Sequence, residues 1–371
     1  MITRLYVDNY KCLVNFEWLP ASLQLILGDN GSGKSTVFDV LGILRDFIVG
    51  GTGVDSAFRE GTLTAWDRRQ EQTFELNIEG DGVYRYRLSV EHELSRMRRR
   101  VKSEELTFDE KKLYCFDGSD AHLFRDDGSR GPSFPFDWSR SAIATIPDRH
   151  DNRRLTWFRD RLKDIYVFSP DPRRMAPVAD REVDSPGLYL EELVGWLRHL
   201  SQQSFEVVNS LRESLRDGVL ESFRDFRLER RGESGRVLQF DFEFSGPSAN
   251  RQKPFSLSLN DLSDGQRCLF ALFTMLHAAV KPGAVLCVDE PDNFVALREL
   301  QPWLTQLSDR VQDQEGQCLL ISHHPELIDY LAAQHGVRFF REEAGLVTVK
   351  PFEWTNDEVL PPSEIVARGW E

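Results

Sequence analysis

The stretch from Gly28 to Ser35, GDNGSGKS, limits what this chain can fold into more than any other part of the sequence. It fits the pattern G-x-x-x-x-G-K-[ST], in which a glycine loop holds phosphate groups. The apolar run at 23–27 predicts a buried strand before the loop, and 37–48 has the apolar spacing of a helix after it. Because the pattern requires a strand, a glycine loop and a helix in this order, we predict a nucleotide-binding site here.

Each part of this loop has a candidate role in holding the nucleotide. Gly31 and Gly33 let the backbone approach the phosphates, while the loop amides and the helix N-terminus present positive charge. Lys34 reaches the β and γ oxygens, and the Ser35 hydroxyl can bind Mg²⁺. The candidate nucleotide-binding residues of the loop are Asn30, Gly31, Ser32, Gly33, Lys34, Ser35 and Thr36.

Length and composition indicate a globular protein of one large or two ordinary domains, with 371 residues and an apolar fraction of 40%. The N-terminus has no signal-peptide apolar core, and no run of 18 apolar residues occurs in the sequence. The cysteines form no C-x-x-C pair and are expected to be free thiols; they are Cys12, Cys115, Cys268, Cys287 and Cys318. We therefore expect a soluble cytoplasmic protein with no membrane partner.

The net charge of −14, from 60 acidic and 46 basic residues, gives no basic footprint for nucleic acid over the whole chain. A local basic site is still open. The densest basic cluster comprises Arg96, Arg98, Arg99, Arg100 and Lys102. Such a hairpin can contact a phosphate backbone, or it can be a solvated face balanced by nearby glutamates, so DNA stays a possible partner.

The region after the nucleotide loop has the period of β-strands. Alternating segments at 73–78, 83–90, 104–109 and 112–116, separated by turn residues, predict an antiparallel β-meander. A helical pattern at 187–216 predicts one or two ordinary helices, which we describe as a helical arm. We expect three segments: 1–165 with the phosphate loop and the β insert, 166–250 with the arm and connecting strands, and 251–371 with the remaining motifs.

Two further buried strands end in candidate catalytic residues. The strand at 284–288 ends in Asp289 and Glu290, where an α/β sheet places ligand chemistry. Asp289 would hold Mg²⁺ through water, and Glu290 would orient or deprotonate the attacking water. The strand at 317–322 ends in His323, which can donate a hydrogen bond to the γ-phosphate. A metal site made by His323 and His324 is the weaker alternative, because neighbouring residues do not easily chelate one ion and no third ligand is evident.

A helix at 268–280 is preceded by Leu262-Ser263-Asp264-Gly265-Gln266, and Ser263 alone reads as an ordinary N-cap. The order of the glycine loop, this LS-x-GQ signature, the DE-P strand end and the S-H strand end resembles the ABC-type ATPase heads of the RecF and SMC branch. It is most similar to compact AAA-family ATPases with an ABC signature, found in bacterial DNA repair and anti-phage defence. The likeness covers about 1–50 and 255–335, with a weaker match at 167–170, which looks like an F-S-P loop.

The resemblance implies an α/β, ABC/RecF-like P-loop ATPase head with the β-meander inserted and a helical arm. It implies ATP and Mg²⁺ as cofactors, and Lys34, Glu290 and His323 as catalytic residues. It also implies a head-to-tail homodimer in which ATP on one subunit is covered by Ser263 and Gly265 of the other, with Lys11 contacting the nucleotide.

Three features depart from the family pattern. The residues after Glu290-Pro291-Asp292-Asn293 are Phe-Val-Ala-Leu in place of Leu-His-Pro. Position 324 is His where relatives have Ser, and no glutamine follows the inserted strands at the metal-sensing loop. These departures leave the dimer-loop contacts and the metal-sensing residue unassigned.

The first functional hypothesis is a dimerising Mg²⁺-dependent ATPase switch, serving as the ATPase or regulatory subunit of a bacterial anti-phage defence complex. Because the segment after His324 is too short for a Toprim nuclease domain, a separate effector, a nuclease or toxin, is expected. The alternative is a RecF-like DNA-binding ATPase in repair or recombination. A transporter ATPase fits less well, because the insert is too long.

The acidic, aromatic tail at 351–370 either docks a partner or packs on its own sheet.

Overall fold

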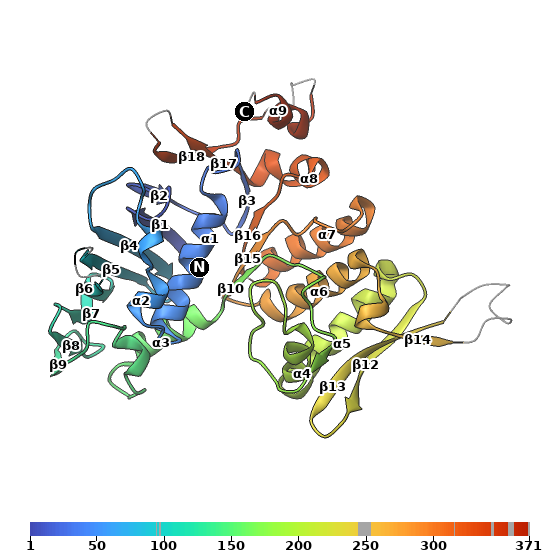
Figure 1. The fold of residues 1–371 in the computed structure, drawn as a ribbon, viewed down its shortest axis with the longest axis horizontal. Coiled ribbons are helices and arrows are strands. Elements are labelled where there is room, and N and C mark those ends of the chain that lie inside the picture. Colours follow the sequence, from blue (N-terminus) through green and yellow to red (C-terminus); the bar gives the residue numbers. More distant parts are fainter. Residues whose placement is uncertain are drawn as a thin grey trace.

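The computed structural model describes residues 1–93, 95, 98–243, 254–314, 316–342, 345–354 and 360–369. This part of the chain contains three β-sheets, and a hydrophobic core lies on each face of the central, mostly parallel sheet (Figure 1). An antiparallel sheet lies on one side of the parallel sheet, and a group of helices lies on the other.

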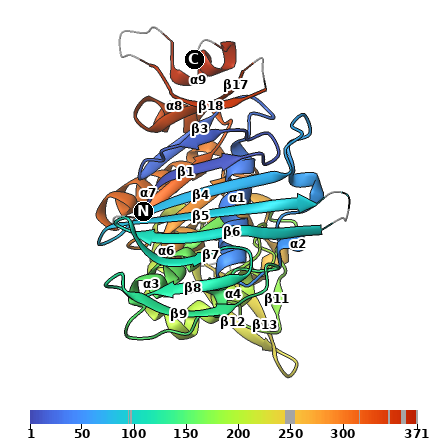
Figure 2. The ribbon, with the colours of Figure 1, turned by 90° about the vertical axis from the view of Figure 1, so that its left-hand side faces the viewer.

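The antiparallel sheet has the strand order β2-β1-β4-β5-β6-β7-β8-β9, and Figure 2 shows it from its outer side. Its strands are β1 (Ile2–Asp8), β2 (Phe16–Trp18), β4 (Glu71–Glu79), β5 (Val83–Glu93), β6 (Arg98–Phe108), β7 (Lys111–Phe116), β8 (Asp120–Phe124) and β9 (Arg130–Pro135). In β4 every second residue is buried, so one face packs inward and the other meets solvent. The predicted β-meander is confirmed, and it continues through two strands that the sequence analysis missed, β8 and β9.

The central sheet has the order β10-β15-β16-β3-β17-β18. Its strands are β10 (Ile165–Phe168), β15 (Val285–Asp289), β16 (Gln317–Ile321), β3 (Leu23–Leu27), β17 (Gly336–Arg341) and β18 (Val347–Pro351). All neighbours are parallel except β17 and β18. Every residue of β3 and β16 is buried, which explains their continuous apolar sequences: both faces of these strands are covered.

Helix α1 (Lys34–Ile48) lies between the two sheets and is buried along much of its length. Its apolar side chains join one hydrophobic core with the inner face of the antiparallel sheet and one face of the parallel sheet. The shorter elements α2 (Val54–Ala57), η1 (Glu60–Thr62), η3 (Ile143–Thr145) and α3 (Arg153–Lys163) complete this side. The phosphate loop is therefore attached to a helix that both sheets hold in place.

The opposite face of the parallel sheet carries the second core and most of the helices. These are α4 (Leu193–Gln203), α5 (Phe205–Ser214), the π-helical turn η4 (Leu215–Val219), α6 (Asp264–Ala279), α7 (Leu297–Gln314), α8 (Pro325–His335) and α9 (Pro362–Arg368). A small sheet packs beside them: β11 (Val178–Ala179), β12 (Phe223–Arg231), β13 (Gly235–Phe242) and β14 (Phe255–Ser258), with η6 (Leu259–Asp261). The predicted helical stretch at 187–216 thus forms two helices, and β12 was missed.

The described part of the tail packs on its own chain. Phe352 and Ile365 are buried in the second core, and α9 lies against α8. The five cysteines are free thiols, and Cys268, Cys287 and Cys318 are buried. Among the described residues, no helix has the length and apolar character needed to cross a membrane.

Candidate active site

The phosphate loop between β3 and α1 has a backbone that requires glycine. Gly28, Gly31 and Gly33 have φ of +133°, +82° and +94°, in the region that other residues rarely adopt. A Cβ at Gly28 would lie 2.2 Å from the carbonyl oxygen of Phe339 in β17. Gly33 is the N-cap of α1 and supplies no side chain to its first amides. The helix N-terminus is therefore available to an anion.

Lys34 is almost fully buried and its amine points back to the loop. It donates hydrogen bonds to the carbonyl oxygens of Gly28 (2.6 Å) and Asp29 (2.9 Å). Burial lowers the pKa of Lys34, while nearby carboxylates, Asp289 first, act in the opposite direction. The hydroxyl of Ser32 is also buried and has no hydrogen-bond partner in the protein. Both groups are donors that phosphate oxygens would satisfy.

Ser35 and Asp289 meet across the site, because the first turn of α1 faces the carboxyl end of β15. The Ser35 hydroxyl is hydrogen-bonded to the Asp289 carboxylate. Burial raises the pKa of Asp289, and the negative charges of Glu290 and Asp39 raise it further. A bound cation would offset this unfavourable charge. A hydroxyl and a carboxylate are oxygen ligands of the kind that Mg²⁺ takes, and phosphate and water would have to complete its shell. The described residues contain no cluster of three or more His, Cys, Asp or Glu that could hold a metal alone.

Two residues beside this pair were missed as site residues. A cavity of about 150 Å³ next to Ser35 and Asp289 is also lined by Asp39 and Ser169. Asp39 lies one helical turn after Ser35, so the helical period was the signal that would have found it. Ser169 follows β10 in the F-S-P stretch, to which the sequence analysis gave no role.

Two of the three catalytic candidates, Glu290 and His323, line a second cavity of about 510 Å³. The residues Gly28, Asp29 and Asn30 of the loop form one side of it, and Glu290 and His323 form another. Glu290 has a left-handed backbone with φ +53°, its amide donates to the carbonyl oxygen of Ile321 (2.8 Å), and its carboxylate accepts from the Asn293 side chain. The structure therefore brings together three predicted residues from three separate strand ends.

The residues around His323 are held by a short hydrogen-bond network. The Ser322 hydroxyl donates to Asp292 (2.6 Å) and accepts from the amide of His324 (2.9 Å). The Nδ1 atom of His324 is buried without a partner in the protein. The network connects the ends of β15 and β16.

Lys11 lies in a tight turn that packs on the first turn of α1. Its backbone is left-handed, with φ +51°, and its amine pairs with Asp39 at 2.6 Å. The neighbouring Cys12 sulfur lies 3.8 Å from the Thr36 hydroxyl. Both Lys11 and Asp39 are about 40% exposed. An exposed pair of this kind adds little stability, so it can open to a stronger anion.

Ser263 and Gly265 lie at the start of α6 and line neither of these cavities. Ser263 is exposed and forms a complete capping box with Gln266. A Cβ on Gly265 would lie 2.9 Å from the carbonyl oxygen of Phe294, whose side chain is exposed and stacked under Arg173. The N-cap interpretation is confirmed, while the chain keeps this signature apart from its own phosphate loop.

The basic cluster is engaged by neighbours in the described part of the chain. Arg100 pairs with Glu91 (2.6 Å) and Lys102 with Glu71 (2.6 Å). Arg99 lies 3.3 Å from Asp55, and Arg98 stacks on Trp138. Arg96 lies outside the described residues.

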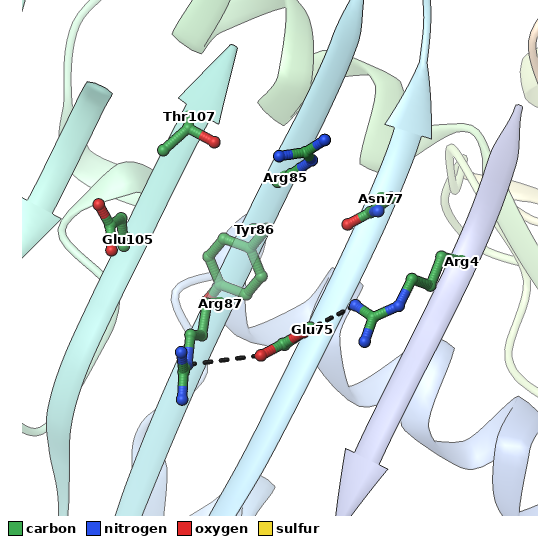
Figure 3. Close-up of a pocket in the computed structure, with 8 residues that line it drawn as sticks. All are labelled: Arg4, Glu75, Asn77, Arg85, Tyr86, Arg87, Glu105 and Thr107. Carbon is green, nitrogen blue, oxygen red and sulfur yellow. Dashed lines mark hydrogen bonds and ion pairs between the residues drawn. The ribbon is translucent and has the colours of Figure 1, made fainter. Parts of the chain in front are cut away.

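A third cavity, of about 470 Å³, lies on the outer face of the antiparallel sheet (Figure 3). Arg4 (2.7 Å) and Arg87 (3.5 Å) share the carboxylate of Glu75 there. The cavity contains none of the predicted site residues; its charged lining comprises three arginines and two glutamates, of which Glu75 is paired with Arg4 and Arg87. It therefore offers no comparable chemistry.

Comparisons with known proteins agree with this arrangement. A family model described as "AAA domain, putative AbiEii toxin, Type IV TA system" matches residues 25–329. A solved Smc head bound to the C-terminal winged-helix domain of ScpA is 14% identical, with a TM-score of 0.55, and the match covers 94% of this chain and 97% of that one. A Pyrococcus furiosus Smc head with an extended coiled coil, bound to the C-terminal domain of ScpA, is 13% identical, with a TM-score of 0.52 and coverage of 94% and 95%. No curated protein matches the sequence.

At these identities the solved structures show the fold alone. They confirm the predicted class, a mixed α/β head of the SMC and ABC type with one antiparallel and one parallel sheet. The family model spans most of the sequence, including the phosphate loop, the signature and the ends of β15 and β16. The chain belongs to the AAA_21 family and carries its P-loop ATPase domain on an SMC-head-like fold.

Proposed function

We propose that this protein is a Mg²⁺-dependent ATPase that acts as a dimerising nucleotide switch. One observation carries the proposal: the structure gathers Lys34, Ser35, Asp289, Glu290 and His323 at the carboxyl ends of the neighbouring strands β3, β16 and β15. This edge of a parallel sheet is where α/β proteins bind ligands.

Each side chain has a role that its position supports. Lys34 leaves the loop carbonyls to bind the β and γ oxygens of ATP, and the loop amides hold the phosphates. Ser35 would hold Mg²⁺ directly and Asp289 would hold it through water, and the ion would neutralise charge on the phosphate oxygens. Glu290 orients and deprotonates the attacking water, and His323 donates a hydrogen bond to the γ-phosphate.

The signature half of the site comes from a second copy of the chain in this proposal. Ser263 and Gly265 are exposed or half-buried at the N-terminus of a long helix and lie outside the chain's own cavities. A head-to-tail pair would place this N-terminus over the ATP of its partner. Lys11 would exchange Asp39 for a phosphate oxygen. Segments 1–165 and 251–371 would then build one catalytic lobe, with 166–250 as the arm.

For the biological role, we propose the ATPase subunit of a bacterial defence or toxin–antitoxin complex with a separate effector. The support is the family description, which names the AbiEii toxin and a type IV system. The DNA-repair alternative has weaker support from the structure: the described cations of the basic cluster already have carboxylate or aromatic partners in the chain, although exposed pairs of this kind are weak.

The test is the Glu290→Gln variant, purified from its native host with and without Mg-ATP. We expect ATP binding to be retained and hydrolysis to fall by about 10²-fold or more, because the general base is lost. The closed dimer should then accumulate in mass-resolved chromatography, together with any effector. Glu299→Gln, an exposed glutamate on α7, is the matched control and should behave like wild type. Wild-type hydrolysis by Glu290→Gln would show that the base assignment is wrong.

A further inference from the structure

The C-terminal helix α9 forms part of the cavity that Glu290 and His323 line. Its residues Ser363, Val366 and Ala367 face the same space of about 510 Å³ as Asn30, Glu290 and His323. Figure 1 shows α9 beside α8, the helix that follows His323. A segment some 40 residues beyond the last motif thus borders the reaction site.

The residues of α9 that line the cavity offer no charged side chain to a phosphate. Ser363 is already engaged: its amide and hydroxyl donate to the two carboxylate oxygens of Asp329 on α8, at 2.7 and 3.0 Å. Val366 and Ala367 have no polar side-chain atoms, and the charges of Glu364 and Arg368 are paired with each other. A γ-phosphate in this cavity finds its donors on the loop and at His323, while the residues of α9 that line the cavity are uncharged.

The position of α9 matters for the dimer. The chain's own signature does not line the cavity, so a second copy must approach the γ-phosphate from outside. The rim of that space includes α9. A helix of seven residues is not stable alone, so its place depends on its contacts. These are the two Asp329 hydrogen bonds, the buried side chains of Pro362 and Ile365, and the Trp354 indole bond to the Leu360 carbonyl oxygen (3.2 Å).

We propose that α9 is an intrachain restraint on the ATP site, which must shift outward before the signature of a second copy can close over the γ-phosphate. Asp329 is the residue that holds α9 against the cavity. The inference rests on the dimer switch proposed above and adds a means of regulating it: whatever displaces α9 favours the closed dimer.

The first test measures the ATP concentration for half-maximal dimer formation in the Glu290→Gln background. Asp329→Ala removes both hydrogen bonds without touching the cavity, and it should lower that concentration by about threefold to tenfold, the equivalent of one or two ordinary hydrogen bonds. Asp313→Ala, an exposed aspartate on α7, is the control and should leave it unchanged. An unchanged or raised concentration for Asp329→Ala would overturn the restraint.

A second variant should act in the opposite direction. Ala367→Trp places a larger side chain on the cavity side of α9. It should raise the ATP concentration for half-maximal dimer formation about tenfold, while the affinity of the monomer for ATP changes little. Ala333→Trp, at an exposed position of α8 outside the cavity, is its control. Equal effects of the two Trp substitutions would also count against the proposal.

Hydrogen exchange separates this inference from the proposed function. On adding Mg-ATP, amides at 362–369 should exchange faster as the dimer forms, because α9 leaves its site. Slower exchange there would instead make α9 a fixed part of the interface and overturn the restraint. If Glu290→Gln forms no ATP-dependent dimer at all, the proposed switch fails, and this inference falls with it.

Discussion

The two halves of the predicted ATP site differ in how the chain holds them. The phosphate-loop half is internal: Lys34 is buried, α1 lies between two sheets, and the ends of β15 and β16 face the loop. The signature half is external, with Ser263 exposed at a capped helix start that belongs to neither cavity. The difference teaches that the chain gathers the phosphate-loop residues and the ends of β15 and β16 around shared cavities, while its signature residues lie outside these cavities. The predictions below test that division.

The largest effect should follow from the buried half. Lys34→Ala removes the cation that faces the phosphates, and charge-assisted hydrogen bonds contribute most to such binding. We expect the affinity for ATP, measured by calorimetry, to fall by about 100-fold, equivalent to roughly 3 kcal/mol. Lys112→Ala, at an exposed ion pair on β7, serves as the control. Unchanged ATP binding by Lys34→Ala would refute the phosphate-loop interpretation.

In the exposed signature half, a negative charge at Ser263 should weaken ATP-dependent dimerisation but leave the thermal stability nearly unchanged. Ser263→Asp keeps an N-cap acceptor, so thermal stability should shift little. Its negative charge would face the γ-phosphate of the partner, and we expect ATP-dependent dimerisation and hydrolysis to fall by about tenfold or more. ATP binding to the monomer should persist. Loss of monomer binding would mean that the two halves meet within one chain.

Mixing the two variants sharpens this comparison. A heterodimer of Lys34→Ala and Ser263→Asp contains one site in which both halves are intact, because each subunit supplies what the other lacks. We therefore expect the mixture to hydrolyse ATP faster than either variant alone. Additive residual rates, with no gain on mixing, would contradict a site shared between two copies.

The prediction with the smallest effect on ATP turnover concerns pH and folding stability, and it separates the two sides of the molecule. Glu104 is buried in the antiparallel sheet and accepts hydrogen bonds from Tyr86, Tyr114 and Ser141. Burial raises its pKa to about 7, although these donors oppose the shift. A raised folded-state pKa gives stability that is full below the ordinary value of 4.5 and is lost as pH rises to about 7.

In urea unfolding, Glu104→Gln should therefore lack a fall of about 3 kcal/mol that the wild type shows between pH 4.5 and 7. On the signature side, burial lowers the pKa of His277 to about 3, which has the opposite sign: its contribution is lost as pH falls below 6.5. His277→Asn should remove that second trend. Identical pH profiles for Glu104→Gln and the wild type would show that Glu104 ionises without cost.

The parts of the fold that were predicted correctly are those whose signal lies in consecutive residues of the sequence. The strand, glycine loop and helix around Lys34, and the apolar strands ending at Asp289 and His323, carry their signal in consecutive residues. Strand β12 was missed because its sequence is rich in arginine, although it forms a local hairpin with the predicted strand β13. Ser169 and α9 reach the site from elsewhere in the chain, and no spacing in the sequence predicts such contacts.

The central position of β3 has a consequence for synthesis. This strand, which carries the phosphate loop, is hydrogen-bonded on one side to β16 and on the other to β17, about 300 residues later in the chain. At ordinary rates of translation, roughly 15 to 60 s separate the emergence of the strand from that of its two neighbours. During this time both edges of an apolar strand are open to wrong pairing. The nascent chain must therefore be shielded, and a messenger truncated before β16 yields a phosphate loop that has no sheet to join.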